Sequence, residues 1–284
     1  MEEGVLRERA TAFRLRADAG EATLLDAALE VARCGGRPEH ARATVEAGLD
    51  RLAGLARRRL APSAGLSAAA ENFCAALRED GGLAGDPARW NERDGSFVDR
   101  VLETGHGLPI ALAVVQVEVA RRLALDAEGV DFPGHFLLRL RRPGEAGEAL
   151  VDPFAVRPLD RDDCTALLRR VEGPQARTMP GHFSATTPLR LFLRMCTNLK
   201  QRAAATGDPL EALAWSAALL GAEPALVLEH RDRALLLERI GDYGAAAREL
   251  AALEEGVAEP GLRDRVRRRR QALEAQARAG RIVH

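Results

Sequence analysis

The sequence has few aromatic residues, little net charge and no long apolar run, and each shortage argues against a class of protein. Aromatic residues make up only 4% of its 284 residues, which favours stacked helices over a large sheet. The 41 basic and 42 acidic residues nearly cancel, so the chain as a whole has no electrostatic drive toward nucleic acid or an anionic membrane. Because no stretch reaches the roughly 18 apolar residues of a transmembrane helix, we expect no membrane partner.

Cysteine is also scarce, which bears on metal and redox chemistry. Cys34, Cys74, Cys164 and Cys196 are scattered and form no Cys-x-x-Cys pair, and the histidines form no His-Glu-x-x-His motif. We therefore expect unbridged, mostly buried thiols, no metal site and no cofactor. The amino terminus is charged throughout and lacks the apolar core of a signal peptide, which predicts a cytoplasmic protein.

Alanine, leucine, arginine and glutamate dominate instead, and their spacing predicts helices in the first third of the chain. Apolar residues recur every three to four positions over Glu39–Leu60, with shorter helical patterns at Thr23–Ala32 and Ser67–Arg78. Further along, the segment Pro109–Leu123 is apolar almost all round. Pro109 suits the first turn of a helix, where an N–H would have no intrahelical acceptor. We expect this segment to form the most buried helix of the protein.

Short strands are expected after this helix, at Glu128–Phe132, His135–Arg141 and Ala149–Asp152. In the second of these, apolar residues occupy alternate positions from Phe136, as in a half-buried strand. A Pro-Gly turn separates the last two strands, so they form an antiparallel pair. A helix followed by antiparallel strands indicates an α+β fold that is mainly α, rather than a parallel sheet.

The chain is helical again from Pro188 onward. The segment Ala225–Leu253 has the proportions of a helical repeat, but only about one and a half such units fit, so no long solenoid is expected. We therefore expect an N-terminal helical region over 1–80, a core over 81–177 and a C-terminal helical region over 178–284. The expected tail helices are Leu189–Ala204, Pro209–Leu220, Ala225–Ile240, Tyr243–Leu253 and Leu262–Ala279.

An ordered set of short motifs runs through these segments, spanning about Leu24 to Leu253. The motifs are Gly95–Glu103, Gly107–Leu112, Ala120–Leu123, Gly129–Leu137, Val151–Phe154, Arg194–Lys200 and Arg231–Leu236. Each is weak alone, but in this order and spacing they resemble the SirB-one family. The resemblance implies a transglutaminase-like (papain-like) core with a small antiparallel sheet, flanked by N-terminal helices and a tetratricopeptide-like helical tail.

The resemblance also implies where a catalytic site would lie. Transglutaminases and cysteine peptidases place a nucleophilic cysteine at the start of the central helix, where the helix terminus and an imidazolium lower its pKa. His135 and Asp152 stand at the positions of the general base and of the acid that orients it. The cysteine position falls on Pro109, or on Ile110 if the register slips by one, and Ala111 replaces the family's usual serine. We therefore expect a vestigial dyad of His135 and Asp152 beside a non-functional nucleophile position.

Each candidate residue also has a structural interpretation. His135 can hold Asp152 as a half-buried polar pair without doing chemistry. Cys164, which follows two aspartates at the start of a helix, and Cys74, inside an apolar helical face, can simply be packed thiols. The basic run Arg263–Arg270 is diluted by acidic residues, as on an ordinary solvated helix, so nucleic-acid binding is not expected.

Two main functional hypotheses of different classes follow, and a third, a nucleic-acid-binding regulator, depends only on the arginine run. The missing nucleophile, joined to helical hairpins, favours a non-catalytic regulatory or scaffold protein, a pseudoenzyme that binds a protein partner through its helical tail. The alternative is a cryptic acyl-transfer or amide-hydrolysing enzyme that uses His135 and Asp152. The two hypotheses differ in whether the protein has a turnover that depends on His135.

Overall fold

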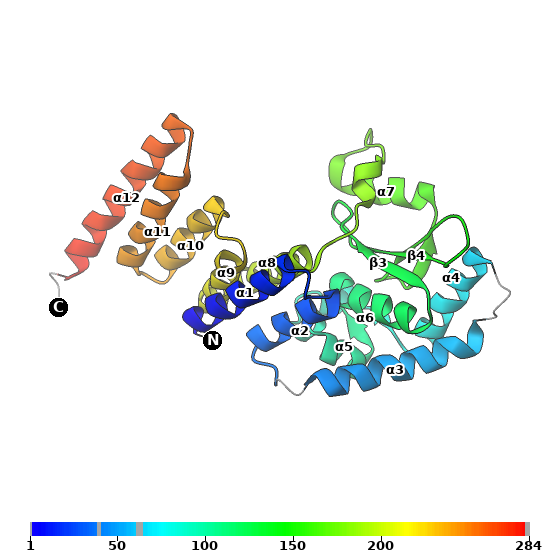
Figure 1. The fold of residues 1–284 in the computed structure, drawn as a ribbon. Helices are drawn as coiled ribbons and strands as arrows, with labels where there is room; N and C mark the ends of the chain where they lie inside the picture. The colour runs from blue at the N-terminus through cyan, green and yellow to red at the C-terminus, as the bar shows by residue number, and fades with distance from the viewer. Residues whose placement is uncertain (1, 39–40, 61–64, 282–284) are drawn as a thin grey trace. The chain divides into compact units, whose positions relative to one another are not determined.

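The chain forms two compact units in the computed structural model, which describes residues 2–38, 41–60 and 65–281. Residues 22–192 form one unit, the core unit, and residues 1–21 together with 193–284 form the other, the helical unit. Helices dominate both units, and a small antiparallel sheet lies in the core unit (Figure 1). The predicted fold class, α+β and mainly α, is confirmed.

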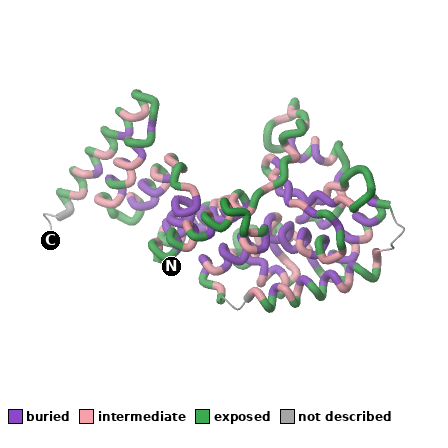
Figure 2. The backbone as a smooth tube through the Cα atoms, viewed as in Figure 1, coloured by how far each residue is buried: buried purple, intermediate pink, exposed green. Residues whose placement is uncertain are grey.

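Helix α6 (Pro109–Arg122) is the centre of the core unit. Ten of its 14 residues are buried, from Ile110 to Ala120 (Figure 2). Strands β3 and β4 pack against it, and so do three helices: α2 (Leu24–Cys34), α3 (Ala41–Arg59) and α5 (Val98–Thr104). A helix covered by neighbours on several sides needs apolar residues all round, which is what the sequence supplies.

The expectation that this helix is the most buried one is wrong. Helix α9 (Pro209–Ala222) of the helical unit is also 14 residues long, and eleven of its residues are buried, from Ala212 to Ala222. Its segment is also apolar nearly all round, and its many alanines let the neighbouring helices approach closely. The sequence therefore shows a nearly all-apolar helix at two places. Helix α9 is the more buried of the two because α1 and α10 pack around it.

The sheet of the core unit has four antiparallel strands in the order β3-β4-β5-β6. Strand β5 (Ala149–Asp152) has the predicted bounds, whereas β3 (Asp126–Val130) and β4 (Leu137–Arg141) differ by two residues at one or both ends. Strand β6 (Arg157–Leu159) was not predicted, because three residues that include a proline give no alternating pattern. Helix α7 (Arg161–Glu172) packs on the sheet through an apolar cluster that includes Cys164 and Leu168.

Shorter elements connect these parts. Helix α4 (Leu66–Ala75) continues into a single π-helical turn, η1 (Ala76–Asp80). Strands β1 (Ala84–Gly85) and β2 (His106–Gly107) form a parallel pair just before α6. The remaining short helices are η2 (Pro87–Arg89), η3 (Asp94–Ser96) and η4 (Pro180–Phe183).

The helical unit is built from successive helices joined by short turns. Gly207 and Gly241 lie in two of these turns with φ near +82° and +80°, a left-handed conformation that favours glycine. Neighbouring helices in the chain pack on one another, as α9 on α10, α10 on α11 and α11 on α12. The helices are α8 (Pro188–Ala205), α9, α10 (Val227–Arg239), α11 (Tyr243–Gly256) and α12 (Pro260–Arg281).

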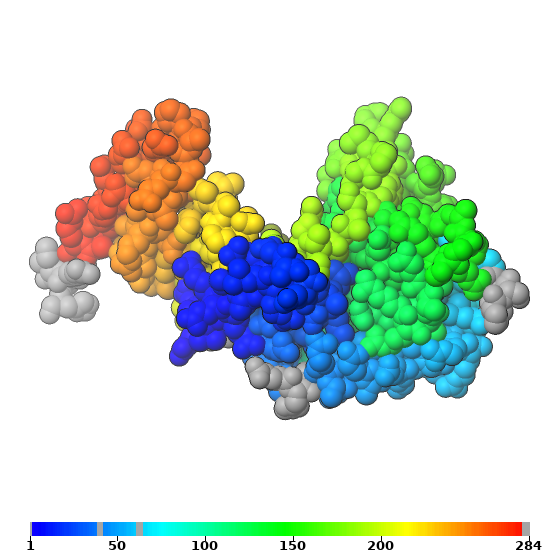
Figure 3. Space-filling model, viewed as in Figure 1, coloured from blue at the N-terminus to red at the C-terminus, as the bar shows by residue number. Residues whose placement is uncertain are grey.

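Helix α1 (Glu3–Asp18) completes the helical unit by packing along α9 (Figures 1 and 3). The two backbones approach so closely that a Cβ on Gly221 would lie 2.3 Å from the carbonyl oxygen of Arg7. The Thr11 hydroxyl donates a hydrogen bond to the carbonyl oxygen of Gly221 over 3.1 Å. The sequence did not predict α1, because its three buried residues, Leu6, Ala10 and Phe13, form too narrow a stripe among charged positions.

Two buried charge clusters tie the helical unit together, and both use residues of the tail motifs. Lys200 donates to both carboxylate oxygens of Glu229, over 2.8 and 2.7 Å, and to Asp232 over 3.0 Å. Arg233 donates to Glu249 over 2.7 Å and to the carbonyl oxygen of Leu213 over 3.0 Å. Charges taken out of water must be paired in this way, so these motif residues have a structural role in joining successive helices.

The arginine run of α12 is also largely occupied by contacts within the helical unit. Arg267 and Arg270 pair with Glu254 over 2.7 and 3.1 Å, and Arg269 pairs with Glu238. Much of the positive charge of this run is therefore balanced by carboxylates of α10 and α11. No helix among the described residues is long and apolar enough to cross a membrane.

Candidate functional site

The amino end of α6 is where the family resemblance predicts the nucleophile position. Leu108 precedes the helix in an extended conformation and Pro109 occupies its first turn, half-buried. Ile110, the position for a register slipped by one, is 4% exposed. Neither side chain has a group that can ionise or attack a carbonyl carbon, so the start of the central helix carries no nucleophile.

His135 and Asp152 lie at the same end of the sheet. His135 is half-buried in the turn that precedes β4, and its backbone N–H donates to the carbonyl oxygen of Phe132 over 3.0 Å. Asp152 is the last residue of β5, and the pairing of Leu138 with Val151 brings the start of β4 next to the end of β5. The backbone register thus puts the two predicted dyad residues at neighbouring strand ends.

The Asp152 carboxylate has a structural task at this end of the sheet. Its Oδ1 accepts hydrogen bonds from the backbone N–H groups of Phe154, over 2.8 Å, and Ala155, over 3.1 Å. An aspartate that bonds the backbone two and three residues further on stabilises a tight turn. One carboxylate oxygen of the predicted dyad is therefore already engaged in holding the chain after β5.

The turn after β5 is fixed to its surroundings from two sides. Gln116, a buried residue of α6, donates from its side-chain amide to the carbonyl oxygen of Pro153 over 2.8 Å. Arg78 donates to the carbonyl oxygen of Val156 over 3.0 Å. Val156 has a φ of +48°, a left-handed conformation that costs a β-branched residue on the order of 1–3 kcal/mol. Strain of this kind persists only where the surroundings hold the backbone firmly, and here α6 and η1 do so.

Neither Cys74 nor Cys164 is suited to act as a substitute nucleophile. All four cysteines are buried. Burial raises the pKa of the Cys74 thiol to about 12; Arg78 lowers it and the nearby Asp152 carboxylate raises it further. Burial also raises the pKa of the Cys164 thiol to about 11, with Asp163 and Asp160 adding to the rise. Cys74 and Cys164 are therefore protonated at neutral pH, whereas catalysis requires a thiolate.

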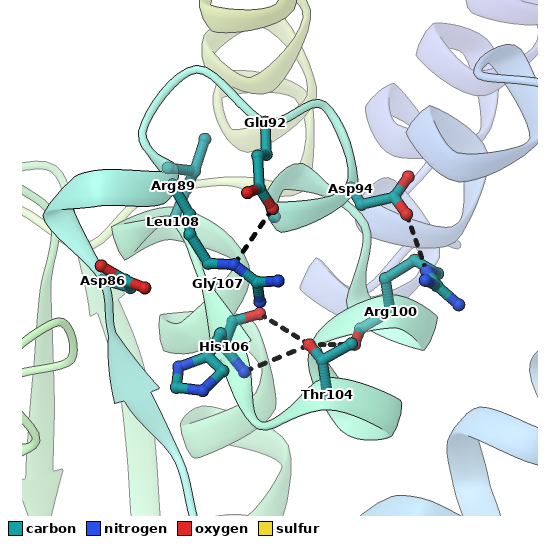
Figure 4. A pocket seen from close by; sticks show the side chains of 10 residues that line it. Asp86, Arg89, Glu92, Asp94, Arg100, Thr104, His106, Gly107 and Leu108 are labelled. Carbon is teal, nitrogen blue, oxygen red and sulfur yellow. Dashed lines mark hydrogen bonds and ion pairs between the residues drawn. The ribbon is translucent and has the colours of Figure 1, made fainter.

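A polar pocket opens beside the residues that lead into α6, with an empty volume of about 410 Å³ (Figure 4). Arg89 pairs with Glu92 over 3.2 Å and Arg100 pairs with Asp94 over 2.9 Å, so its charged groups are largely neutralised. The remaining lining residues include Asp86, Thr104, His106, Gly107 and Leu108.

His106 is a residue of this pocket that the sequence did not single out as functional. Its Nδ1 is buried and has no hydrogen-bond partner among the residues that the structure describes. The only available signal was the Gly105-His106-Gly107 triplet immediately before the central helix. The Thr104 hydroxyl beside it donates to the carbonyl oxygen of Arg100 over 2.8 Å and is not paired with a base. The pocket can bind polar groups, but the Thr104 hydroxyl that lines it is not activated for attack.

Metal chemistry has no visible support in the described ranges. No group of three or more histidine, cysteine, aspartate or glutamate side chains lies close enough there to hold a metal ion. The candidate residues are thus a proline at the amino end of α6, two polar residues at neighbouring strand ends of the sheet, and a polar pocket beside the residues that lead into α6.

Comparison with known proteins assigns the region around α6 and the sheet to a family. A model of the transglutaminase-like superfamily matches residues 43–197, which include α6, His135 and Asp152. The chain is 35% identical over 140 residues to a UPF0162 protein of Pseudomonas aeruginosa, covering 49% of the chain and 50% of that protein. It is 32% identical over 173 residues to a UPF0162 protein of Xylella fastidiosa, covering 60% of the chain and 61% of that protein.

A more extended similarity reaches the tail. The chain is 23% identical over 219 residues to the protein SirB1 of Salmonella typhimurium, covering 77% of the chain and 81% of that protein. The matches to the two UPF0162 proteins span about half and three fifths of those relatives' lengths. No solved structure matches the chain significantly.

Proposed function

Because this chain belongs to the transglutaminase-like superfamily, with SirB1 and UPF0162 proteins among its relatives, we propose that it is a non-catalytic member that acts by binding another protein. The observation that carries the proposal is that α6 begins with Pro109 and Ile110, where the family resemblance predicts the nucleophile. Without a side chain that can form a thioester, the site retains polar groups but no covalent route for acyl transfer.

The helical region supports the binding half of the proposal. Packed helical hairpins present long surfaces to partner segments, and the region 178–284 supplies five helices of this kind. Several large apolar side chains of the helical unit remain exposed, including Leu210, Leu228 and Leu235. Aliphatic groups held on rigid helices are suited to docking a partner, so we assign the regulatory or scaffold role to this region, in a cytoplasmic protein.

The dyad residues take a structural role in this proposal. Asp152 stabilises the turn after β5, and His135 lies at the neighbouring strand end. The competing proposal is a cryptic acyl-transfer or amide-hydrolysing enzyme that uses His135 and Asp152. Its support is the position of these two residues, and it needs a nucleophile from outside the four buried cysteines.

An amine-incorporation assay and a peptide-amide hydrolysis assay separate the two proposals. Purified full-length protein is compared with its His135→Ala variant, with unfolding curves to check that both are folded. We expect both proteins to give the background rate, because removing an imidazole cannot change a reaction that lacks a nucleophile. Turnover by the unmodified protein that disappears in His135→Ala would overturn the non-catalytic proposal.

A further inference from the structure

Helices α11 and α12 lie side by side (Figure 3), and residues of both helices line an open groove. Its lining includes four small residues, Gly244, Ala247, Ala251 and Ala277. Small side chains let a peptide backbone approach the helices closely, in a way that leucine or phenylalanine would prevent. We call this surface the α11–α12 groove.

One stretch of the groove is lined by two acidic and two basic residues, Glu254, Glu255, Arg263 and Arg270. Glu254 of α11 accepts hydrogen bonds from Arg267 over 2.7 Å and from Arg270 over 3.1 Å. Arg270 also pairs with Glu274 on its own helix over 2.6 Å. Glu255 and Arg263, which also line this stretch, carry opposite charges, so it offers little net charge to a ligand.

The half of the groove with the small residues carries two arginines of a different kind. Arg248 and Arg278 line it and are exposed, and no ion pair joins either to a carboxylate of the described chain. The Arg278 guanidinium donates only to the carbonyl oxygen of Glu274, over 3.3 Å. Glu274 itself is taken by Arg270. Two unbalanced positive charges therefore stand on opposite helices beside a surface of alanine and glycine.

This arrangement fits one class of ligand best. A guanidinium binds a carboxylate through two parallel hydrogen bonds, and two guanidiniums on facing helices suit two acidic groups of one extended chain. A nucleic-acid backbone would need a continuous basic stripe, but the neighbouring arginines at 267, 269 and 270 are paired with glutamates. We propose that the α11–α12 groove is the docking site for an acidic peptide segment of a partner protein, whose carboxylates are bound by Arg248 and Arg278.

This inference rests on the proposed binding function, and a peptide titration tests it. A fluorescein-labelled peptide of alternating glutamate and alanine is titrated with the full-length protein, and binding is read from fluorescence anisotropy. We expect saturable binding that weakens with added salt and falls by about tenfold or more in Arg248→Ala/Arg278→Ala, because the charge-assisted bonds are lost.

The matched control is Arg265→Ala/Arg268→Ala, which removes two exposed arginines of α12 outside the groove lining and changes the net charge equally. It should bind the peptide within about twofold of the unmodified protein, since a loss of charge elsewhere acts only at long range. A second variant, Ala251→Glu, keeps both arginines and places a carboxylate in the groove. It should also lose the peptide, through repulsion between like charges.

Several results would overturn the inference. No saturable binding of the peptide, or equal loss in the two double variants, would exclude this groove as the site. Tighter binding of duplex RNA, lost in Arg248→Ala/Arg278→Ala, would assign the arginines to nucleic acid instead. A dimer that dissociates in the same variant would assign them to a second copy of the chain. Failure of the peptide test leaves the assay with His135→Ala unaffected, so the two proposals can fail separately.

Discussion

Single atoms decide how closely α1 and α9 can pack. Gly221 is the position of closest approach, since any side chain there would meet the backbone of Arg7. The Thr11 hydroxyl bonds the Gly221 carbonyl oxygen across the same contact. The glycine is needed for space, because a backbone atom cannot move aside as the end of a flexible side chain can.

We therefore predict that Gly221→Ala destabilises the protein by about 1–3 kcal/mol, the usual cost of overpacking a well-packed contact. The measurement is the free energy of unfolding from urea denaturation. Gly4→Ala is the control, because a Cβ at Gly4, within α1, meets nothing within 4 Å and alanine is the better helix former. Equal midpoints for Gly221→Ala and the unmodified protein would contradict the contact.

Residues of the candidate site could be predicted only where the sequence pattern marks a strand end. His135 and Asp152 lie at the ends of strands that the alternation indicates, and the family resemblance added their roles. The structural task of Asp152, the hydrogen bond from Gln116 to Pro153 and the pocket around His106 were not predictable. Each depends on segments far apart in the chain, for which no local pattern exists.

At the scale of elements, periodicity predicted the helices with wide apolar faces and missed those with narrow ones. Helix α11 begins at Tyr243 and β5 covers Ala149–Asp152, both as predicted. Helix α1 was missed because its few apolar residues are buried by α9, a segment about two hundred positions away. The π-helical turn at the end of α4 was predicted as a continuation of the helix, since a one-residue change in hydrogen-bond register leaves no trace in composition.

The junction of α10 and α11 should make stability depend on pH. Burial alone would raise the pKa of Glu249, but hydrogen bonds from His230 and Arg233 outweigh it and hold the pKa below its usual 4.5. A carboxylate with a lowered pKa in the folded state contributes stability above its unfolded pKa and loses it as pH falls through the folded value. We predict that the free energy of unfolding decreases as the pH is lowered below about 4.5.

The check is urea denaturation across this pH range for the unmodified protein and for Glu249→Gln. The variant removes the titrating group, so it should be less stable at neutral pH and lose less of its remaining stability on acidification. Other carboxylates, such as Asp232, also have lowered pKa values and will leave part of the slope in place. Parallel pH curves for the two proteins would contradict a role for Glu249.

At the scale of the whole molecule, the chain joins a transglutaminase-like core to a helical unit with its own buried charge clusters. In the core, the position at which the family resemblance predicts the nucleophile holds Pro109, at the start of α6. If this is correct, the missing sulfur alone accounts for the missing chemistry, and restoring it should restore reactivity.

The most direct measurement is intact-protein mass spectrometry after incubation with an activated ester, from which a thiolate takes the acyl group and releases a phenolate. We predict no His135-dependent adduct on the unmodified protein. Pro109→Cys should gain one acyl group at the substituted position, more slowly by about tenfold or more when combined with His135→Ala. Ile110→Cys tests the slipped register. Stoichiometric acylation of the unmodified protein that His135→Ala abolishes would contradict the account.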